Sequence, residues 1–239
     1  DANYHLTTGE VALKPLFMSL AENGYNDIVY KMATAEDMPS YGYFVRQEAT
    51  SLPEYWDMRA SQNHCMMGHL DEWFYSHLAG IRNEGLAYDS ITFEPYFASD
   101  LSWVKARMNT VRGVVAVEWE KSDDNNILLN VNVPFGAKAS LIVPNIFQVT
   151  EKGSAIDETD GVQEVVQGAK GLCISLGSGS YKFQMEVKTD RIDNAVKGTQ
   201  NRTSQSLIYN MKGQVVGSGA SSLNNGIYVR RGQKWAHVK

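Results

Sequence analysis

Ile127-Leu128-Leu129-Asn130-Val131-Asn132-Val133 is the segment that decides the fold class, because its apolar side chains recur with the two-residue period of a strand. The segments 91–94, 114–119, 141–143 and 181–187 have a similar β-rich pattern. Turn-forming residues separate them at 123–126, 134–136 and 177–180. Many short strands joined by regular turns predict an antiparallel β-sandwich over residues 86–189.

Residues 1–85 follow the 3.6-residue period of helices instead. One apolar face comprises Val11, Leu13, Leu16, Phe17 and Leu20, and Asn23-Gly24 then breaks the pattern as at a helix C-terminus. Further helices are expected over about 27–34 and 66–81, with an irregular segment at 41–63 between them. This order is typical of stacked helical hairpins. The change of period near residue 86 indicates two domains rather than one mixed sheet.

The C-terminal end has a different organisation. Residues 190–205 are polar and nearly free of large apolar side chains, which is typical of a linker. Residues 206–239 form a short β-rich module, with strand-like segments at 207–211, 214–216 and 226–230. About 35 residues are too few to build much core alone.

The composition is that of a folded globular protein, because 43% of the 239 residues are apolar and 21% are charged. With 22 basic and 27 acidic residues the formal net charge is −5, which argues against disorder and against nucleic-acid binding through a basic face. No window approaches the roughly 18 apolar residues of a membrane span. Cys65 and Cys173 form neither a metal-type pair nor a disulfide framework, so no metal and no cofactor are expected.

The segment 41–64 is the strongest candidate for chemistry, because it combines aromatic rings with charged groups. These residues are Tyr41, Tyr43, Phe44, Tyr55 and Trp56 together with Glu48, Glu54, Asp57, Arg59 and His64. Ring faces suit the apolar side of a pyranose, carboxylates accept hydrogen bonds from its hydroxyls, and a carboxylate can also act as a general base on water. A solvated loop with a few buried rings would have the same composition, so both interpretations stay open.

Other motifs are weaker. The sequence contains no HExxH array, no GxSxG serine motif and no phosphate-binding loop. Glu118 and Glu120 alternate with Val117 and Trp119, which predicts that the two carboxylates lie on the solvent face of a strand.

The loop and the helix after it resemble a known family. The motifs are Gln47 to Asp57 (QEATSLPEYWD), Ser61-Gln62-Asn63-His64, Glu72-Trp73-Phe74-Tyr75 and Leu78-Ala79-Gly80-Ile81, with His5-Leu6-Thr7-Thr8-Gly9 upstream and Gly177 to Phe183 downstream. At this spacing they resemble bacterial α-L-rhamnosidases of glycoside hydrolase family 78, over about residues 4–188. The resemblance implies that residues 1–85 are the C-terminal part of an (α/α)6 catalytic barrel, followed by the sandwich.

The resemblance also implies a mechanism and site residues. The reaction is an inverting hydrolysis of terminal α-L-rhamnosyl residues, in which one carboxylic acid protonates the leaving oxygen and a carboxylate activates water. Glu54 matches the general base, His64 a rhamnose-contacting histidine and Trp56 a ring of the sugar pocket, and Asp57 is expected to bind substrate beside them.

Two residues depart from the family pattern. Pro53 replaces a Trp, which removes an aromatic wall and puts the exact sugar in doubt, and Glu48 replaces a Gly. No residue of 1–53 matches the family's general acid, which lies upstream. We therefore expect this chain to be the C-terminal part of a longer rhamnosidase, and to be inactive alone.

Residues 206–239 resemble the C-terminal sorting domains of type IX secretion in Bacteroidetes, on the basis of segments 208–216 and 226–229. This resemblance implies a secreted or cell-surface protein that uses outer-membrane secretion machinery, with the periplasm as the alternative. A small accessory β-module is the competing interpretation. The expected partner is a rhamnose-containing glycoside or polysaccharide, with no nucleic acid and no membrane span. A non-catalytic carbohydrate-binding or cell-surface attachment module remains the alternative function.

Overall fold

The computed structural model describes residues 3–123 and 125–188, and the backbone of four strands at 208–210, 215–217, 226–230 and 233–237. The chain divides into two compact units, residues 1–190 and 191–239, and each is described by itself. The expected linker, residues 190–205, lies outside the described residues. No helix in the described part of the chain is long and apolar enough to cross a membrane.

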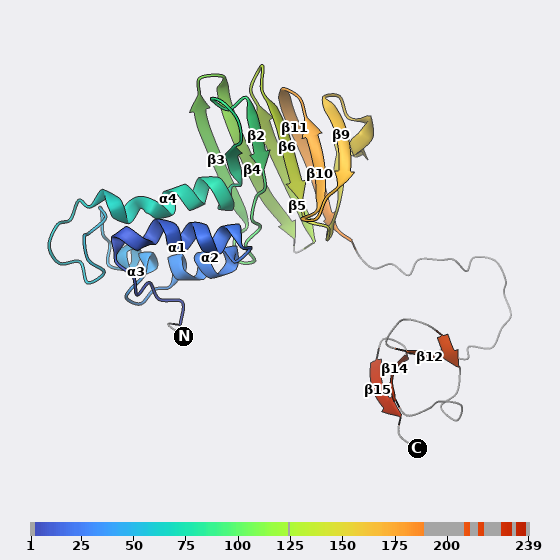
Figure 1. The fold of residues 1–239 in the computed structure, drawn as a ribbon, viewed down its shortest axis with the longest axis horizontal. Helices are drawn as coiled ribbons and strands as arrows, with labels where there is room; N and C mark the ends of the chain where they lie inside the picture. Colours follow the sequence, from blue (N-terminus) through green and yellow to red (C-terminus); the bar gives the residue numbers. More distant parts are fainter. Residues whose placement is uncertain are drawn as a thin grey trace. The chain divides into compact units, whose positions relative to one another are not determined.

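The first unit begins with helices that lie side by side in Figure 1. They are α1 (Glu10–Glu22), α2 (Asn26–Thr34), α3 (Tyr41–Arg46), a 3-10 turn η1 (Cys65–His69), α4 (Leu70–Trp73) and a π-helical turn η2 (Phe74–Leu78). The last three form one continuous helical run, which confirms the third predicted helix. The described residues contain these few helices and no closed helical barrel.

Helix α3 corrects the expectation that residues 41–63 are irregular throughout. Ser40 is fully buried, and its side-chain oxygen accepts the backbone N–H of Tyr43 at 3.1 Å as an N-cap. The same hydroxyl lies 2.7 Å from the carbonyl oxygen of Asp37, to which it donates. A capping serine outside any long apolar repeat therefore starts a helix of six residues.

The helices share one core. On α1 the buried side chains are Leu13, Phe17 and Ala21, whereas Val11 is 74% exposed and does not belong to the predicted apolar face. Trp73 of α4 is fully buried, and its indole N–H donates to the side-chain oxygen of Asn26 at 2.9 Å. This bond fixes the start of α2 against the last helical run.

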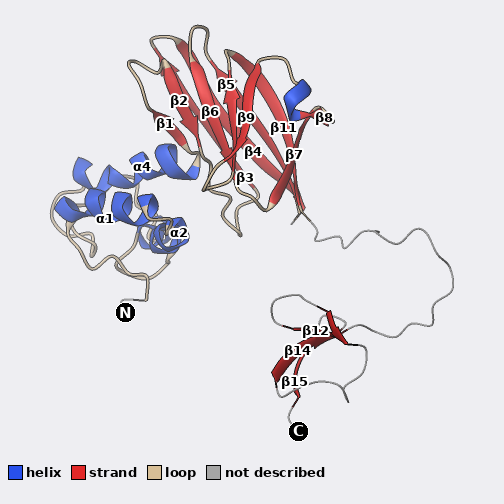
Figure 2. Cartoon of the chain, turned by 45° about the vertical axis from the view of Figure 1, so that its right-hand side comes forward, coloured by secondary structure: helices blue, strands red, loops and turns tan. Residues whose placement is uncertain are grey.

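Two stacked sheets follow (Figure 2). The first has the order β1 (Ile81–Asn83), β2 (Ser90–Phe93), β6 (Lys138–Val143), β10 (Leu172–Leu176) and β9 (Val162–Gln167). The second has the order β3 (Trp103–Thr110), β4 (Gly113–Asp123), β5 (Asn126–Val133), β11 (Gly179–Val187), β7 (Phe147–Glu151) and β8 (Ser154–Ala155), and a 3-10 turn η3 (Ile156–Glu158) follows β8. The pairings are antiparallel except for β2 and β6, which run parallel.

Alternation of side chains builds the core between the sheets. Val117 and Trp119 of β4 are buried, whereas Glu118 and Glu120 are exposed, which confirms the solvent-face prediction. Together with Phe93 and Phe183, Trp119 belongs to one continuous apolar cluster between the sheets. The predicted antiparallel sandwich is therefore confirmed, with one parallel pair that the sequence pattern did not indicate.

The change from helix to strand falls earlier than expected. The last helical turn ends at Leu78, and Ile81 already belongs to β1 rather than to the third helix. Gly80, between them, has a φ of +74°, a left-handed backbone conformation that ends the helix.

The second unit contains a four-stranded sheet. Its order is β13 (Val215–Gly217), β12 (Ile208–Asn210), β14 (Gly226–Arg230) and β15 (Gln233–His237). The described pairings in it are antiparallel. The rest of the predicted tail segment lies outside the described residues.

Candidate functional site

The loop between α3 and η1 carries the four residues predicted to act on substrate. Its two arms are joined by backbone hydrogen bonds, from the N–H of Glu54 to the carbonyl oxygen of Ser61 at 2.8 Å and from the N–H of His64 to that of Leu52 at 2.8 Å. The arms therefore form a narrow neck, with residues 55–60 at the tip of the loop. Met58 and Ala60, both in the tip, have φ angles of +62°, a backbone conformation that residues other than glycine seldom adopt.

Glu54 lies in the neck of this loop. Its side chain is half-buried, and its carboxylate oxygen Oε2 lies 3.4 Å from the backbone N–H of Ser61, which donates to it. One carboxylate oxygen is thus held by the main chain of the opposite arm. Within the described residues the other oxygen accepts no hydrogen bond, so it is open to a water molecule.

His64 lies at the end of the same neck. Its Nε2 contacts Oε2 of Glu10, the first residue of α1, and both side chains are 25% exposed. The contact fastens the loop to the start of α1. The sequence pattern did not single out Glu10. An acidic residue in the first turn of a helix is the only sign of it in the sequence, and the helix dipole is a simpler explanation for such a residue.

Trp56 is an anchor of the loop. Its indole N–H donates to the carbonyl oxygen of Thr8 at 3.0 Å. Its ring stacks on Phe44 at a centroid distance of 5.3 Å and 15°, and meets Tyr41 edge-on at 5.3 Å and 88°. Phe44 therefore covers one face of the ring, and only the remaining surface is available to a sugar.

Asp57 lies in the tip of the loop. Its Oδ1 accepts the backbone N–H of Arg59 at 3.3 Å and lies 3.5 Å from the Nε of the same residue. The guanidinium of Arg59 lies 4.3 Å from the ring centroid of Tyr55. Asp57 and Trp56 share a shallow hollow of about 280 Å³ with Leu6 and Tyr55.

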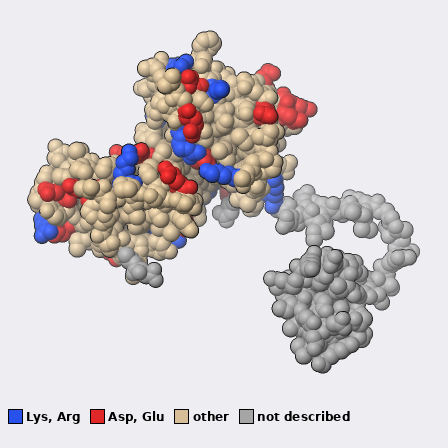
Figure 3. Space-filling model, viewed as in Figure 1, with Lys and Arg blue, Asp and Glu red and all other residues tan. Residues whose placement is uncertain are grey.

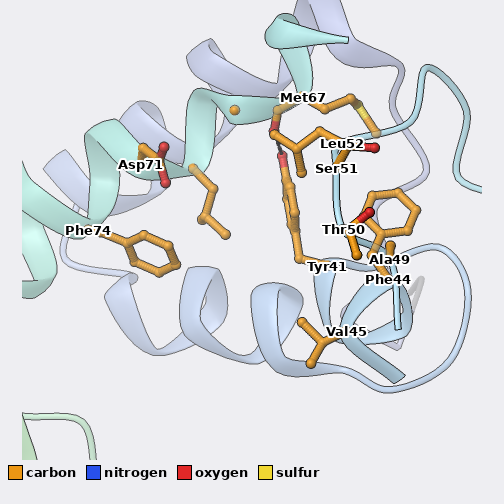
Figure 4. Close-up of a pocket in the computed structure, with 12 residues that line it drawn as sticks. Tyr41, Phe44, Val45, Ala49, Thr50, Ser51, Leu52, Met67, Asp71 and Phe74 are labelled. Atoms are coloured by element: carbon orange, nitrogen blue, oxygen red, sulfur yellow. Dashed lines mark hydrogen bonds between the residues drawn. The ribbon is translucent and has the colours of Figure 1, made fainter. Parts of the chain in front are cut away.

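A second, mainly apolar pocket of about 380 Å³ lies behind the loop (Figure 4). It is lined by residues of α3, the loop and the last helical run, among them Tyr41, Leu52, Met67, Asp71 and Phe74. The hydroxyl of Tyr41 donates to the carbonyl oxygen of Met67 at 2.5 Å. Burial, and after it the charge of Asp71, raises the pKa of Tyr41, so its hydroxyl stays protonated.

The four predicted residues therefore do not converge on one cavity within the described residues. Trp56 and Asp57 share the shallow hollow, Glu54 is held by Ser61, and His64 by Glu10. None of the four lines the apolar pocket. In the part of the chain that the structure describes, no group of three or more His, Cys, Asp or Glu side chains could hold a metal ion.

Two family models match the chain. The bacterial alpha-L-rhamnosidase 6 hairpin glycosidase domain matches residues 1–78, and the bacterial alpha-L-rhamnosidase C-terminal domain matches residues 80–155. The two matches meet at residue 79, where the structure changes from helix to strand. The family comparison and the fold therefore divide this part of the chain at the same place.

Individual known proteins agree with the two family models. An alpha-L-rhamnosidase of Formosa agariphila is 28% identical over 77% of this chain, and one of Streptomyces avermitilis is 24% identical over 76%. The solved structure of an α-L-rhamnosidase from Dictyoglumus thermophilum is 37% identical over 77% of the chain, with a TM-score of 0.68. The Streptomyces avermitilis structure, at 23% identity and a TM-score of 0.66, shares the fold. The chain spans 18–21% of the length of these proteins.

Proposed function

We propose that the protein hydrolyses terminal α-L-rhamnosyl residues with inversion, using Glu54 as the general base. In sequence and fold, the chain corresponds to the C-terminal part of a bacterial α-L-rhamnosidase. The observation that carries the proposal is the neck of the loop. It holds Glu54 by one oxygen and fixes His64 ten residues later, within a chain whose relatives are named alpha-L-rhamnosidases.

In an inverting mechanism the base takes a proton from the attacking water. The backbone N–H of Ser61 donates to one oxygen of Glu54, which orients the carboxylate. The free oxygen then accepts the water proton. The partner acid stands about 6.5–9.5 Å from the base in such enzymes, to leave room for water and sugar. No residue of this chain is assigned to that acid, so we propose that it lies in a segment outside these residues.

We propose that His64 and Trp56 act on the sugar from fixed positions. Glu10 occupies Nε2 of His64, which leaves Nδ1 to hydrogen-bond a sugar hydroxyl. Trp56, held by Thr8 and Phe44, contributes its uncovered edge to the hollow that it shares with Asp57. Pro53 has no aromatic ring and is buried. The wall that an aromatic residue would form is therefore absent at this position.

We propose that the helical part, up to about residue 79, is the last part of an (α/α)6 catalytic barrel and that the strands from β1 onward are its β-sandwich domain, which moves the boundary expected at residues 85–86 to about residue 79. The apolar pocket supports this proposal, because Tyr41, Leu52 and Phe74 leave a concave apolar surface on the helical side. Phe74 is 38% exposed, and Val45 beside it is 77% exposed. Preceding helices of the barrel would cover this surface.

The test of the catalytic proposal is Glu54→Gln in the protein that carries the preceding residues as well as this chain. We expect kcat on an aryl α-L-rhamnoside to fall by about 10²–10⁴-fold, with KM little changed, because the amide cannot take the proton of water. Glu48→Gln, in the same loop but exposed, is the matched control and should keep near-normal turnover. Turnover of the Glu54 variant within a few-fold of the parent would contradict the assignment. Turnover by the 239-residue chain alone would contradict the need for an acid outside it.

For localisation, we propose that residues 206–239 direct export by type IX secretion machinery to the cell surface or medium. The resemblance of the tail supports this, together with its antiparallel β-sheet. Removing residues 206–239 in a host with this machinery should leave the protein in the periplasm. Unchanged export of the truncated protein would favour the accessory-module interpretation.

A further inference from the structure

A cavity of about 730 Å³ lies where the helices meet the first sheet of the sandwich. We call it the junction cavity. Its helical side includes Glu22, Asn26 and His77, and its sandwich side includes Arg82 and Lys170. The volume lies within the range of about 300–1,000 Å³ that is typical of small-molecule sites.

Charged groups in the junction cavity are held in place by one another. Glu94 lies 2.5 Å from the guanidinium of Arg82, and its two carboxylate oxygens lie 3.1 and 3.2 Å from Nζ of Lys170. Nε of Arg82 is also 3.6 Å from Glu84. Burial opposes ionisation of Glu94, but the hydrogen bonds from Arg82 and Lys170 outweigh it and hold the pKa of that carboxyl below its usual value. Glu94 is thus ionised, and it orients Arg82 and Lys170 before a ligand arrives.

Apolar residues line the junction cavity as well. They are Pro95, Tyr96, Ile142 and Pro144. The backbone N–H of Tyr96 lies 3.2 Å from the carbonyl oxygens of both His77 and Leu78, which ties this part of the lining to the last helical turn. A cavity lined by both apolar residues and oriented polar groups suits a sugar ring, which has an apolar face and a rim of hydroxyls.

The charge of the junction cavity selects among ligands. Three carboxylates, of Glu22, Glu84 and Glu94, face two cations. Burial, followed by the charge of Arg82, lowers the pKa of His77, so this ring is neutral near pH 7. Figure 3 shows charged side chains of both signs gathered where the helices meet the sandwich. The small negative excess disfavours an anion, whereas carboxylates and a guanidinium together can accept from and donate to neutral hydroxyls.

We propose that the junction cavity is a binding site for a neutral saccharide unit, separate from the loop that carries Glu54. The sugar ring packs on Tyr96 and Pro144, which are half-buried, while its hydroxyls contact Glu22, Glu84 and Arg82. This site does not depend on the proposed catalytic function, because none of its residues belongs to that loop.

The test is a ligand-observed NMR titration of the 239-residue chain with D-galactose, L-rhamnose and D-galacturonate. D-Galactose and D-galacturonate share a ring and differ by one carboxylate, so they separate shape from charge. We expect saturable binding of a neutral sugar with a dissociation constant of about 1 mM. The anion should bind at least about tenfold more weakly, because the cavity has a negative excess.

Variants then locate the binding. The double substitution Glu22→Gln and Glu84→Gln should weaken it by about five- to tenfold, since charge-assisted hydrogen bonds become neutral ones. Both side chains are exposed enough for the variant to fold. The matched control is Gln184→Ala, which lies in a polar hollow of about 460 Å³ on the other sheet and should leave affinity unchanged. His64→Ala should also leave it unchanged.

Each remaining outcome overturns the proposal. Absence of saturable binding up to about 100 mM of either neutral sugar excludes a site of useful affinity. Galacturonate binding as tightly as galactose contradicts the charge argument. Equal affinity in the double variant places the ligand elsewhere. Loss of binding in His64→Ala would assign it to the loop, which would support the proposed function while refuting the junction site.

Discussion

Gly80→Ala should destabilise the first unit strongly, because the chain passes itself at this point with no room for a side chain. A Cβ at Gly80 would lie 2.2 Å from the carbonyl carbon of Glu94, 2.3 Å from its oxygen and 2.3 Å from the nitrogen of Pro95. These are backbone atoms, and the N–H of Glu94 already donates to the carbonyl oxygen of Gly80 at 2.9 Å. Neither the backbone at Gly80 nor the backbone at Glu94 and Pro95 can move aside without breaking the first pairing of β1 with β2.

The magnitude follows from two contributions. The φ of +74° costs an alanine about 1–2 kcal/mol, and forcing an extra carbon into a packed site costs about 1–3 kcal/mol. The free energy of unfolding should therefore fall by about 2–5 kcal/mol. For a unit of this size that lowers Tm by about 4–20 °C.

Gly153→Ala is the matched control. Gly153 lies in the turn between β7 and β8 with a φ of +83°, and nothing lies within 4 Å of its Cβ position. It should lose only the conformational contribution, about 1–2 kcal/mol. The assay is thermal unfolding followed by tryptophan fluorescence, since Trp73 and Trp119 are buried in this unit. Equal losses in the two variants would refute the close-approach argument.

Three further predictions concern the same unit. Glu48→Gly should raise the free energy of unfolding by about 1 kcal/mol in a denaturant titration, because Glu48 is exposed with a φ of +55°, and a decrease would contradict this. Ser40→Ala should lower it by about 1–2 kcal/mol through loss of the α3 cap, and an unchanged denaturation midpoint would show that the cap is dispensable. Glu94 has a depressed pKa in the folded state, so its contribution is present above its unfolded value of about 4.5 and is lost as pH falls below that value. Parent and Glu94→Gln should therefore converge in Tm as the pH falls below about 4.5, and a difference that stays constant below that pH would contradict the ion-pair account.

The sequence predicted strands that correspond to β2, β4, β5, β6 and β11, and it missed the other strands of the sandwich, among them the eight-residue β3. Segments such as 127–133 and 181–187 are confirmed as β5 and β11. Along both segments, apolar side chains on one face of the strand alternate regularly with more polar ones on the other. Ile81 was assigned to the third helix, since it continues the helical spacing from Leu78. The fold is decided there by the pairing of Ile81 with Phe93, a contact that no local pattern contains.

The candidate site was predicted by residue type but not by arrangement. Trp56 and His64 lie in one loop, yet the residues that hold them, Thr8 and Glu10, lie more than forty-five residues earlier in the chain. Composition cannot show such long-range contacts. The apolar pocket beside Tyr41 was missed for the same reason, since its walls come from α3, the loop and the last helical run.

These contacts change which residues count as part of the site. If only its neck held the loop, the tip would be flexible, because residues 55–60 have few internal hydrogen bonds. Thr8 holds the tip through Trp56, and Glu10 holds the neck through His64, so a stretch of three residues at the start of α1 fastens both. A carboxylate must stay within hydrogen-bonding reach of its water to serve as a base. On the proposed assignment of Glu54 as the base, the start of α1 is a positioning element for it, although the sequence shows this segment only as the beginning of an ordinary helix.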